Sequence, residues 1–365
     1  MSKADLYEIH KKKKYPTRTG AALAIILVIG TFLAIGAYSL QIFWDRFGST
    51  VTSILNTFGL SSITSNMLVL VILLSGGFIL LSAVMVMVAA ALANRLGGTL
   101  IYLGAVTMTI FTLVIPLAGM LMAGMSLATI QSTWMVFIPG LFIAGFTLLL
   151  FTVFRGRVRR AGEIIKLTGR VCLDEPAIFI PPLVAMLFTI LAVVMGAAIY
   201  VAFTPMDVLL GTEPYTTETM IPIVASSITV LFLTIFVYKF AYAVSSAMAY
   251  IYVCGGDPSL GEGVRAAMRV IGGITALAVL GTIITLLVRL IRQAGRRAGG
   301  AGALAGRVAG GAIQWVWAMI NYFTIPVMVA EGKSTKDSIK RSARLLWDNL
   351  MDVVIKETGV RWGFG

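Results

Sequence analysis

The sequence has little charge for its length. Only 12% of its 365 residues are charged, against about 25% in typical soluble domains. Hydrophobic residues make up 58%, and the mean hydropathy is +0.94. Charged side chains can all be placed outside long apolar runs, with Lys239 the clear exception. Because hydrocarbon holds no water, each apolar run must satisfy its own backbone as a helix. The composition excludes a soluble domain and predicts an all-α, polytopic membrane protein.

Residues that usually carry catalysis or bind metals are also scarce. His10 is the only histidine and has no partner at ligand spacing, and no GxSxG, HExxH, CxxC or P-loop pattern occurs. No acid lies inside an apolar run, which argues against an aspartyl protease or a carboxylate proton relay. Cys172 and Cys254 are expected to be small buried hydrophobes rather than a disulfide framework. Met120–Met125 could attract Cu(I), but methionine is also a common gap filler. We therefore expect no enzyme, no cofactor and no metal.

Eight apolar runs are long enough to cross a hydrocarbon core, which takes about 20 helical residues. They are Gly20–Trp44, Met67–Ala93, Leu100–Met125, Trp134–Phe154, Ala177–Thr204, Met220–Val253, Val270–Val288 and Gly310–Ala330. The first is too long for a signal peptide and lacks a clear cleavage site. The expected fold is a transmembrane helical bundle of about eight spans with short amphipathic interfacial helices. The expected parts are a basic cytoplasmic tail (1–19), two four-span units (20–154 and 155–332), and an amphipathic helix with a tail (333–365).

Basic residues in the short loops predict the orientation. Six lie before Gly20 and six between Arg155 and Arg170, whereas the loop after the fifth run has three acids and no base. This places the N-terminus in the cytoplasm of a multi-pass protein of the cell membrane. Five arginines between Arg289 and Arg307 disagree, so the last two runs either cross fully, which we favour, or form a re-entrant pair. The glycine-rich stretch Ala294–Gly311 is expected to be a flexible connector near lipid headgroups.

Three short basic stretches have the periodicity of amphipathic surface helices. They are Arg160–Ile165, Arg265–Ile271 and Arg341–Leu346, and two of them directly precede an apolar run. In the second, Asp257-Pro258 would supply the N-cap and the first helical residue. We interpret the three as degenerate copies of one unit, a surface helix followed by a membrane hairpin. The alternative is that any cytoplasmic loop tends to be basic and amphipathic.

The last basic stretch has the clearest pattern. Ser334 and Asp337 have the spacing of a capping box. An apolar stripe follows at helical spacing, formed by Ile339, Ala343, Leu346, Leu350 and Val354. A helix with one apolar and one basic face lies in the membrane interface rather than across it.

Two sets of residues are candidate contacts. The candidate headgroup contacts are Arg159, Arg160, Lys336, Lys340, Arg341 and Arg344, and the expected partner is a bilayer with anionic headgroups rather than nucleic acid. The candidate lipid or solute contacts are Lys239, Asn321 and Thr324. Lys239 either snorkels to the interface or contacts a substrate or lipid. Pro116 and Pro326 could kink their helices, and Asn321 and Thr324 could then use freed backbone groups, unless the kinks serve packing alone.

Three stretches carry a resemblance to known proteins: GGDPSLGEGVRAAMR (Gly255–Arg269), NYFTIPVMVAEG (Asn321–Gly332) and DSIKRSARLLWDN (Asp337–Asn349). From about Arg155 to Gly365 the chain resembles an uncharacterised family of prokaryotic multi-pass membrane proteins, a domain of unknown function. It is also distantly similar to the membrane regions attached to some glycerophosphodiester phosphodiesterases. The resemblance implies a membrane fold with no known activity. It also implies further hydrophobic sequence after the last surface helix, which a partner subunit could supply.

These observations lead to two functional hypotheses. The first is a non-enzymatic membrane module that organises lipid or a partner protein. The alternative is a transporter or channel for an apolar or weakly polar small solute, whose path only Lys239, Asn321 and scattered Ser and Thr could line. An enzyme that relies on the chemistry of its lipid substrate has no residue to carry it.

Overall fold

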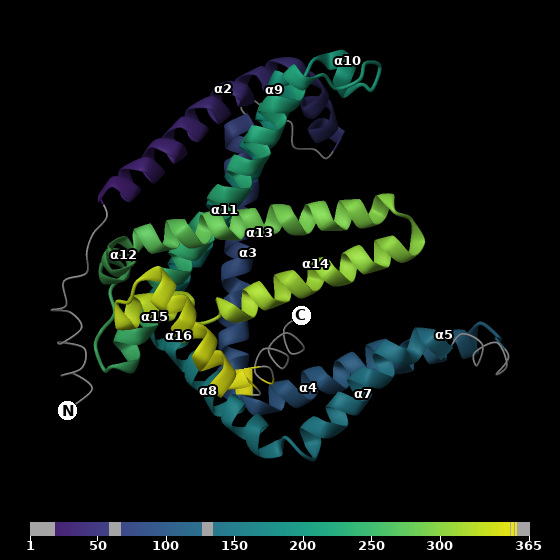
Figure 1. The fold of residues 1–365 in the computed structure, drawn as a ribbon, viewed down its shortest axis with the longest axis vertical. Coiled ribbons are helices and arrows are strands. Elements are labelled where there is room, and N and C mark those ends of the chain that lie inside the picture. The colour runs from purple at the N-terminus through teal and green to yellow at the C-terminus, as the bar shows by residue number, and fades with distance from the viewer. Residues whose placement is uncertain (1–18, 58–66, 126–133, 351, 354, 356–365) are drawn as a thin grey trace. The chain divides into compact units, whose positions relative to one another are not determined.

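The computed structural model describes residues 19–57, 67–125, 134–350, 352, 353 and 355 (Figure 1). Helices make up 89% of the structure and these ranges contain no strand, which confirms the all-α class. Seven helices in this part are long and apolar enough to cross a membrane, or eight if the bent pair α7 (Ile138–Phe151) and α8 (Arg155–Asp174) counts as one span. Only 11% to 33% of each such span is buried, so most of its apolar surface faces outward, which suits lipid rather than water. The predicted tail up to residue 18, with His10, lies outside the described residues.

The described chain forms two compact units. The first contains the described residues up to Ala83 together with Ala177–Arg344, and the second contains Val84–Pro176 with the described residues from Leu345 onward. Each unit is thus discontinuous in sequence, whereas the predicted four-span parts were continuous. Helices α3 (Met67–Leu96) and α16 (Thr335–Asp348) contribute residues to both units.

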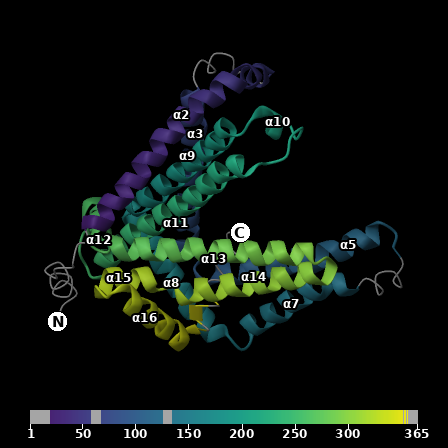
Figure 2. The same ribbon diagram turned by 45° about the horizontal axis from the view of Figure 1, so that its top comes forward.

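In the first unit, α2 (Thr19–Thr57), α9 (Ile180–Phe203) and α11 (Thr217–Val253) pack side by side (Figure 2). Glycines allow close packing both between α2 and α9 and between α9 and α11. A β-carbon on Gly36 of α2 would lie 2.8 Å from Cβ of Met195, and one on Gly196 of α9 would lie 2.6 Å from a methyl group of Val230. The core between these helices is apolar and consists of Phe32, Ala192, Met195, Ile199 and Leu233.

Helix α2 has 39 residues and extends well beyond the predicted end at Trp44. Arg46 is the reason that this extension packs on the protein. Its Nη1 donates hydrogen bonds to the carbonyls of Val201 at 2.9 Å and Thr204 at 3.4 Å. These carbonyls belong to the end of α9, where the helix itself supplies no donors and where positive charge is favoured.

Helices α13 (Ile271–Arg297) and α14 (Gly300–Ile320) form a tight hairpin (Figure 1). The stretch Ala294–Gly311 is helical except at Ala298 and Gly299, so the prediction of a flexible connector was wrong. A β-carbon on Gly306 would lie 3.0 Å from Cα of Gly295, and one on Gly295 would lie 2.6 Å from the carbonyl oxygen of Gly302. The glycines are thus used to bring two backbones together, as small residues do in membrane helix pairs.

The helix is interrupted after α14 by a turn at Asn321–Phe323, and α15 (Thr324–Glu331) follows this turn. An interruption near Pro326 is therefore present, as predicted. Ser342 of α16 bridges it, because its hydroxyl donates to the carbonyl of Ile320 at 2.6 Å and accepts from the backbone N–H of Phe323 at 3.0 Å. Ser342 is fully buried. It thereby removes the cost of about 1–3 kcal/mol that an unpaired buried backbone group carries.

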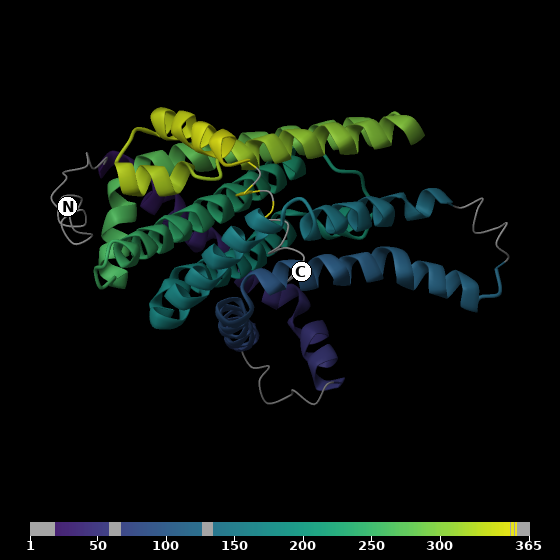
Figure 3. The ribbon, with the colours of Figure 1, turned by 90° about the horizontal axis from the view of Figure 1, so that it is seen from below.

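In the second unit, α4 (Gly98–Thr109), the π-helix η2 (Ile110–Val114) and α5 (Ile115–Met122) continue one another, and α7 packs beside α4 (Figure 3). Pro116 lacks an N–H and so leaves the carbonyl of Thr112 without its usual donor. Gly140 of α7 fits against this carbonyl, because a β-carbon there would lie 2.6 Å from the oxygen. The predicted irregularity at Pro116 thus takes the form of a π-helix.

The first and third predicted surface stretches lie within α8 and α16, and the second lies in α12 (Leu260–Arg269) up to Arg269, where the helix ends before a turn at Val270. The N-cap predicted for α12 was wrong: the hydroxyl of Ser259, not Asp257-Pro258, accepts the N–H of Glu262 at 3.2 Å. The cap predicted for α16 is confirmed, since Ser334 accepts the N–H of Asp337 at 3.3 Å.

The face that α16 buries differs from the predicted apolar stripe. Ser338, Ser342 and Leu346 are buried, whereas Ile339 and Ala343 are only half-buried. The buried face of α16 includes Ser342, whose hydroxyl bonds to backbone groups of Ile320 and Phe323. Val354, the last residue of the predicted stripe, lies outside the described residues.

Replacing Gly306 with valine should separate α13 from α14, because the new side chain meets the backbone of Gly295. We expect a loss of about 1–3 kcal/mol in the free energy of unfolding in detergent. Gly311→Val is the matched control, since nothing lies within 4 Å of a β-carbon at Gly311. Equal stabilities of the two variants would contradict the packing described for this hairpin.

Candidate functional site

The basic helix α8 follows the apolar helix α7 after a bend of 87°. Its first turn contains Arg155 and Arg157 but no acid, and no side chain caps it. A helix N-terminus already carries about half a positive charge, so arginine there is unfavourable for the helix itself. Arg157 is offset by Asp352, 3.7 Å away. The start of α8 is consequently a region that attracts anions.

Two glycines hold α8 against the preceding helices. A β-carbon on Gly162 would lie 2.5 Å from Cα of Gly98, and one on Gly169 would lie 2.5 Å from the backbone nitrogen of Asn94. The two glycines are seven residues apart and therefore share one face of the helix. The same face of α8 also carries the buried side chains of Val158, Ala161 and Ile165. Helix α8 is thus fixed in place by backbone contact rather than tethered by its ends.

A cleft of about 750 Å³ lies beside this contact. We call it the α4–α8 cleft. It is lined by Leu96, Gly98, Thr99, Tyr102, Arg155, Gly156, Val158, Arg159, Gly162, Glu163 and Lys166. The side chain of Lys166 lies over Gly97, because a β-carbon on Gly97 would be 2.5 Å from Cε of Lys166. Gly97 has φ of 51°, a conformation that glycine adopts without strain.

The α4–α8 cleft is cationic. Arg155, Arg159 and Lys166 are exposed and share one flank of α8, at spacings of four and seven residues. The single carboxylate is Glu163, 3.7 Å from Arg159, in a solvent-exposed pair of the kind that contributes little. Three cations less one carboxylate leave two positive charges in the cleft. Guanidinium groups bind phosphate through paired hydrogen bonds, and an ammonium adds a point charge.

Another flank of α8 exposes apolar side chains. Ile164 is 46% and Leu167 is 48% exposed, although the helix is otherwise rich in charge. A helix with a protein-bound face, a cationic flank and an apolar flank has the features expected at a membrane surface.

The predicted headgroup contacts are only partly gathered at this cleft. Arg159 lines it, while Arg160 is exposed on α8 outside the lining. The basic residues of α16 are exposed at Lys336, Lys340 and Arg344, and Arg341 instead pairs with Glu331 at 3.3 Å. Arg155 and Lys166 were missed as site residues, although their spacing from Arg159 could have indicated them. Headgroup binding by these side chains stays a prediction.

Lys239, Asn321 and Thr324 have local roles in the structure. Asn321 donates to the carbonyl of Trp317 at 3.0 Å, and Thr324 donates to that of Ile320 at 3.4 Å, so both bond to the helix they follow. Lys239 is half-buried on α11. A β-carbon added to Gly281 of α13 would lie 3.9 Å from Cε of Lys239. Within the described ranges, no hydrogen bond joins Lys239 to the other two.

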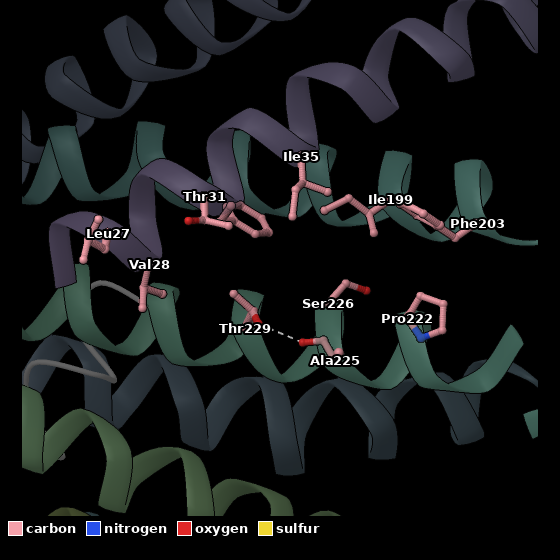
Figure 4. A pocket seen from close by; sticks show the side chains of 11 residues that line it. Leu27, Val28, Thr31, Ile35, Ile199, Phe203, Pro222, Ala225, Ser226 and Thr229 are labelled. Carbon is pink, nitrogen blue, oxygen red and sulfur yellow. Dashed lines mark hydrogen bonds between the residues drawn. The ribbon is translucent and has the colours of Figure 1, made fainter. Parts of the chain in front are cut away.

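An apolar pocket of about 460 Å³ lies between α2, α9 and α11 (Figure 4). Its walls include Ile35 and Ile199, which face Ser226 across the pocket (Figure 4). The hydroxyls of Ser226 and Thr229 donate to carbonyls of their own helix, at 3.0 and 2.8 Å. The pocket therefore offers apolar surface and no charge.

Both cysteines are free, Cys254 buried and Cys172 half-buried. Among the described residues, no group of three or more His, Cys, Asp and Glu side chains is placed to hold a metal ion.

The fold and its exposed apolar helices define an all-α, multi-pass membrane protein. Residues 223–365 match the model of a family described as a Family of unknown function (DUF6159). This part contains all three stretches on which the resemblance was based, but the match begins at residue 223 rather than near Arg155. No similarity to glycerophosphodiester phosphodiesterases is found. No curated protein matches the chain.

Replacing Gly162 with alanine should displace α8, because the added methyl group meets the backbone of Gly98. We expect the free energy of unfolding to fall by about 1–3 kcal/mol. Gly156→Ala on the same helix has open space around its β-carbon. Alanine is also the better helix former, so this control should match the wild type or exceed it by about 1 kcal/mol. Thermal unfolding in detergent measures both, and the reverse order of stability would contradict the docking described for α8.

Proposed function

We propose that this protein is a non-enzymatic module of the cell membrane that binds anionic lipid headgroups and so organises lipid, or a partner protein, around itself. The observation that carries the proposal is the α4–α8 cleft, in which Arg155, Arg159 and Lys166 share one flank of a rigidly docked helix. A fixed helix presents its charges without first being ordered by the ligand, which lowers the cost of binding.

The bend between α7 and α8 gives the cleft its place in the membrane. Because the two helices meet at 87°, α8 runs along the membrane surface if α7 crosses the bilayer. Ile164 and Leu167 then enter the acyl boundary, while Arg159 and Lys166 reach the phosphate level with their long side chains. We place this surface in the cytoplasmic leaflet, because α8 belongs to the basic stretch that predicts the inner side.

The strength of this interaction follows from the charges. Each Lys or Arg near an anionic membrane surface contributes about 1 kcal/mol. The two net positive charges of the cleft therefore favour anionic over zwitterionic headgroups by about 2 kcal/mol, or roughly 30-fold, at low salt. The exposed basic side chains of α16, Lys336, Lys340 and Arg344, are further headgroup contacts in this proposal. A second membrane subunit is the other partner that we propose, since the spans leave most of their apolar surface uncovered.

The alternative function is a transporter or channel for an apolar or weakly polar solute. The break at Asn321–Phe323 favours it, since transporters build sites from discontinuous helices. Ser342 nevertheless takes up the freed carbonyl of Ile320 and the N–H of Phe323. Solute flux into proteoliposomes well above that of empty liposomes would favour this alternative over the proposed function.

Removing the three positive charges of the cleft should abolish the preference of the cleft for anionic lipid. The triple variant Arg155→Gln, Arg159→Gln, Lys166→Gln is titrated with short-chain phosphatidylglycerol and phosphatidylcholine in neutral detergent. We expect the roughly 30-fold preference of the cleft to be lost, and the wild-type preference to shrink as salt is added.

The matched control removes three charges elsewhere, at Arg296, Arg297 and Arg307 near the turn of the α13–α14 hairpin. It should keep most of the preference. Equal losses in the two triple variants would mean that total charge, rather than the cleft, selects the lipid, and the proposal would then be wrong.

A further inference from the structure

A second cavity, of about 480 Å³, lies between α9, α11 and α13. Val230 and Leu231 of α11 supply apolar wall, and Ser227 and Thr234 of the same helix supply hydroxyl groups. Gly196 brings α9 against Val230 at its base, since a β-carbon there would lie 2.6 Å from the valine methyl group. We call this space the Arg289 cavity, because Arg289 of α13 is its one charged lining residue.

Arg289 has no counter-charge among the residues that the structure describes. Within the described ranges, no ion pair or hydrogen bond involves its guanidinium group. The three helices that form the cavity contain one acid, Glu218, in the first turn of α11. Lys239 adds a further cation where α11 meets α13. Arg289 follows directly after the apolar run Val270–Val288, so it lies at the end of the span, where an arginine side chain can reach the phosphate level of the membrane.

The cavity is accessible from the side of the bundle. Val193, Ala197 and Ser227 are exposed as well as Arg289. These residues belong to spans whose outward surface faces lipid, so the molecules that reach the cavity are membrane components. Its volume is within the range of about 300–1,000 Å³ that is usual for small-ligand sites.

We propose that the Arg289 cavity holds one anionic membrane lipid, with its phosphate on Arg289 and an acyl chain against Val230 and Leu231. Charge complementarity selects this occupant: the guanidinium supplies the donors that a phosphate accepts, and the walls supply the apolar surface that a chain needs. Hydroxyls of Ser227 and Thr234 are available for the glycerol oxygens. The apolar pocket on α2, α9 and α11 shares Ser226 but has no cation, so it does not discriminate between headgroups (Figure 4).

Native mass spectrometry of the full chain in detergent tests the site. The protein is offered equimolar phosphatidylglycerol and phosphatidylcholine with the same acyl chains. For the wild type we expect one strongly retained phosphatidylglycerol at this site, in addition to any lipid that the α4–α8 cleft holds. Arg289→Gln should lower its retention about tenfold, whereas Arg289→Lys should keep a partial preference, since it retains the charge but not the planar fork. Arg296→Gln is the control, because Arg296 lies on the same helix and does not line the cavity.

A second variant tests the apolar wall of the cavity without changing its charge. Leu231→Trp fills the apolar wall and should reduce retention of the lipid while Arg289 stays in place. Thermal unfolding in detergent identifies any variant that has lost its fold. Retention by Arg289→Gln equal to the wild type, equal losses in Arg289→Gln and Arg296→Gln, or release of the lipid by millimolar inorganic phosphate would each overturn the proposal.

This site stands apart from the α4–α8 cleft. The triple variant of Arg155, Arg159 and Lys166 should keep the lipid of the Arg289 cavity, and Arg289→Gln should keep the headgroup preference of the cleft. Each proposal can therefore fail alone.

Discussion

Contact between helix backbones, made possible by glycine, is the constraint on which both units depend. Lipid tails are as apolar as the side chains of the spans, so burial alone gives these helices little reason to associate. Close approach supplies dispersion and weak Cα–H···O contacts instead. Gly98 meets Gly162 in one unit, and Gly295 meets Gly306 in the other. A methyl group at Gly162, Gly295 or Gly306 would lie within 3.0 Å of backbone atoms, which cannot rotate away.

The rigid contacts explain how the protein can present cationic side chains without acids beside them. Helix α8 is fixed by Gly162 and Gly169, so Arg155 and Lys166 stay at the α4–α8 cleft although neither of them has an ion pair among the described residues. The α13–α14 hairpin is likewise held by its glycines, and Arg289 is not needed for its packing. In both places the unbalanced charge is free to act on an anion from the membrane.

The helical class and most apolar runs could be predicted from the sequence, because length and hydropathy alone determine which segments can span. The contacts between helices could not, because they depend on pairs distant in sequence. The stretch that contains Gly295 and Gly306 was interpreted as a flexible connector, because a high glycine content is typical both of linkers and of closely packed helix pairs. Ser342 was missed as well, because nothing near it reveals that Ile320 and Phe323 need its hydroxyl. Arg159 was predicted from local periodicity as a headgroup contact, and the structure places it in the lining of the α4–α8 cleft, while headgroup binding itself stays a prediction.

The central claim is that α8 lies on the membrane surface with its cationic flank exposed to water. Single cysteines placed through 155–174, in a chain whose Cys172 and Cys254 are replaced by alanine, test it most directly. Inside-out membrane vesicles are treated with a maleimide that cannot cross lipid. The account predicts labelling with helical periodicity, fast at Arg159 and Glu163 and slow at Val158 and Ile165. Uniform protection of the whole segment would contradict it, because α8 would then lie inside the bilayer.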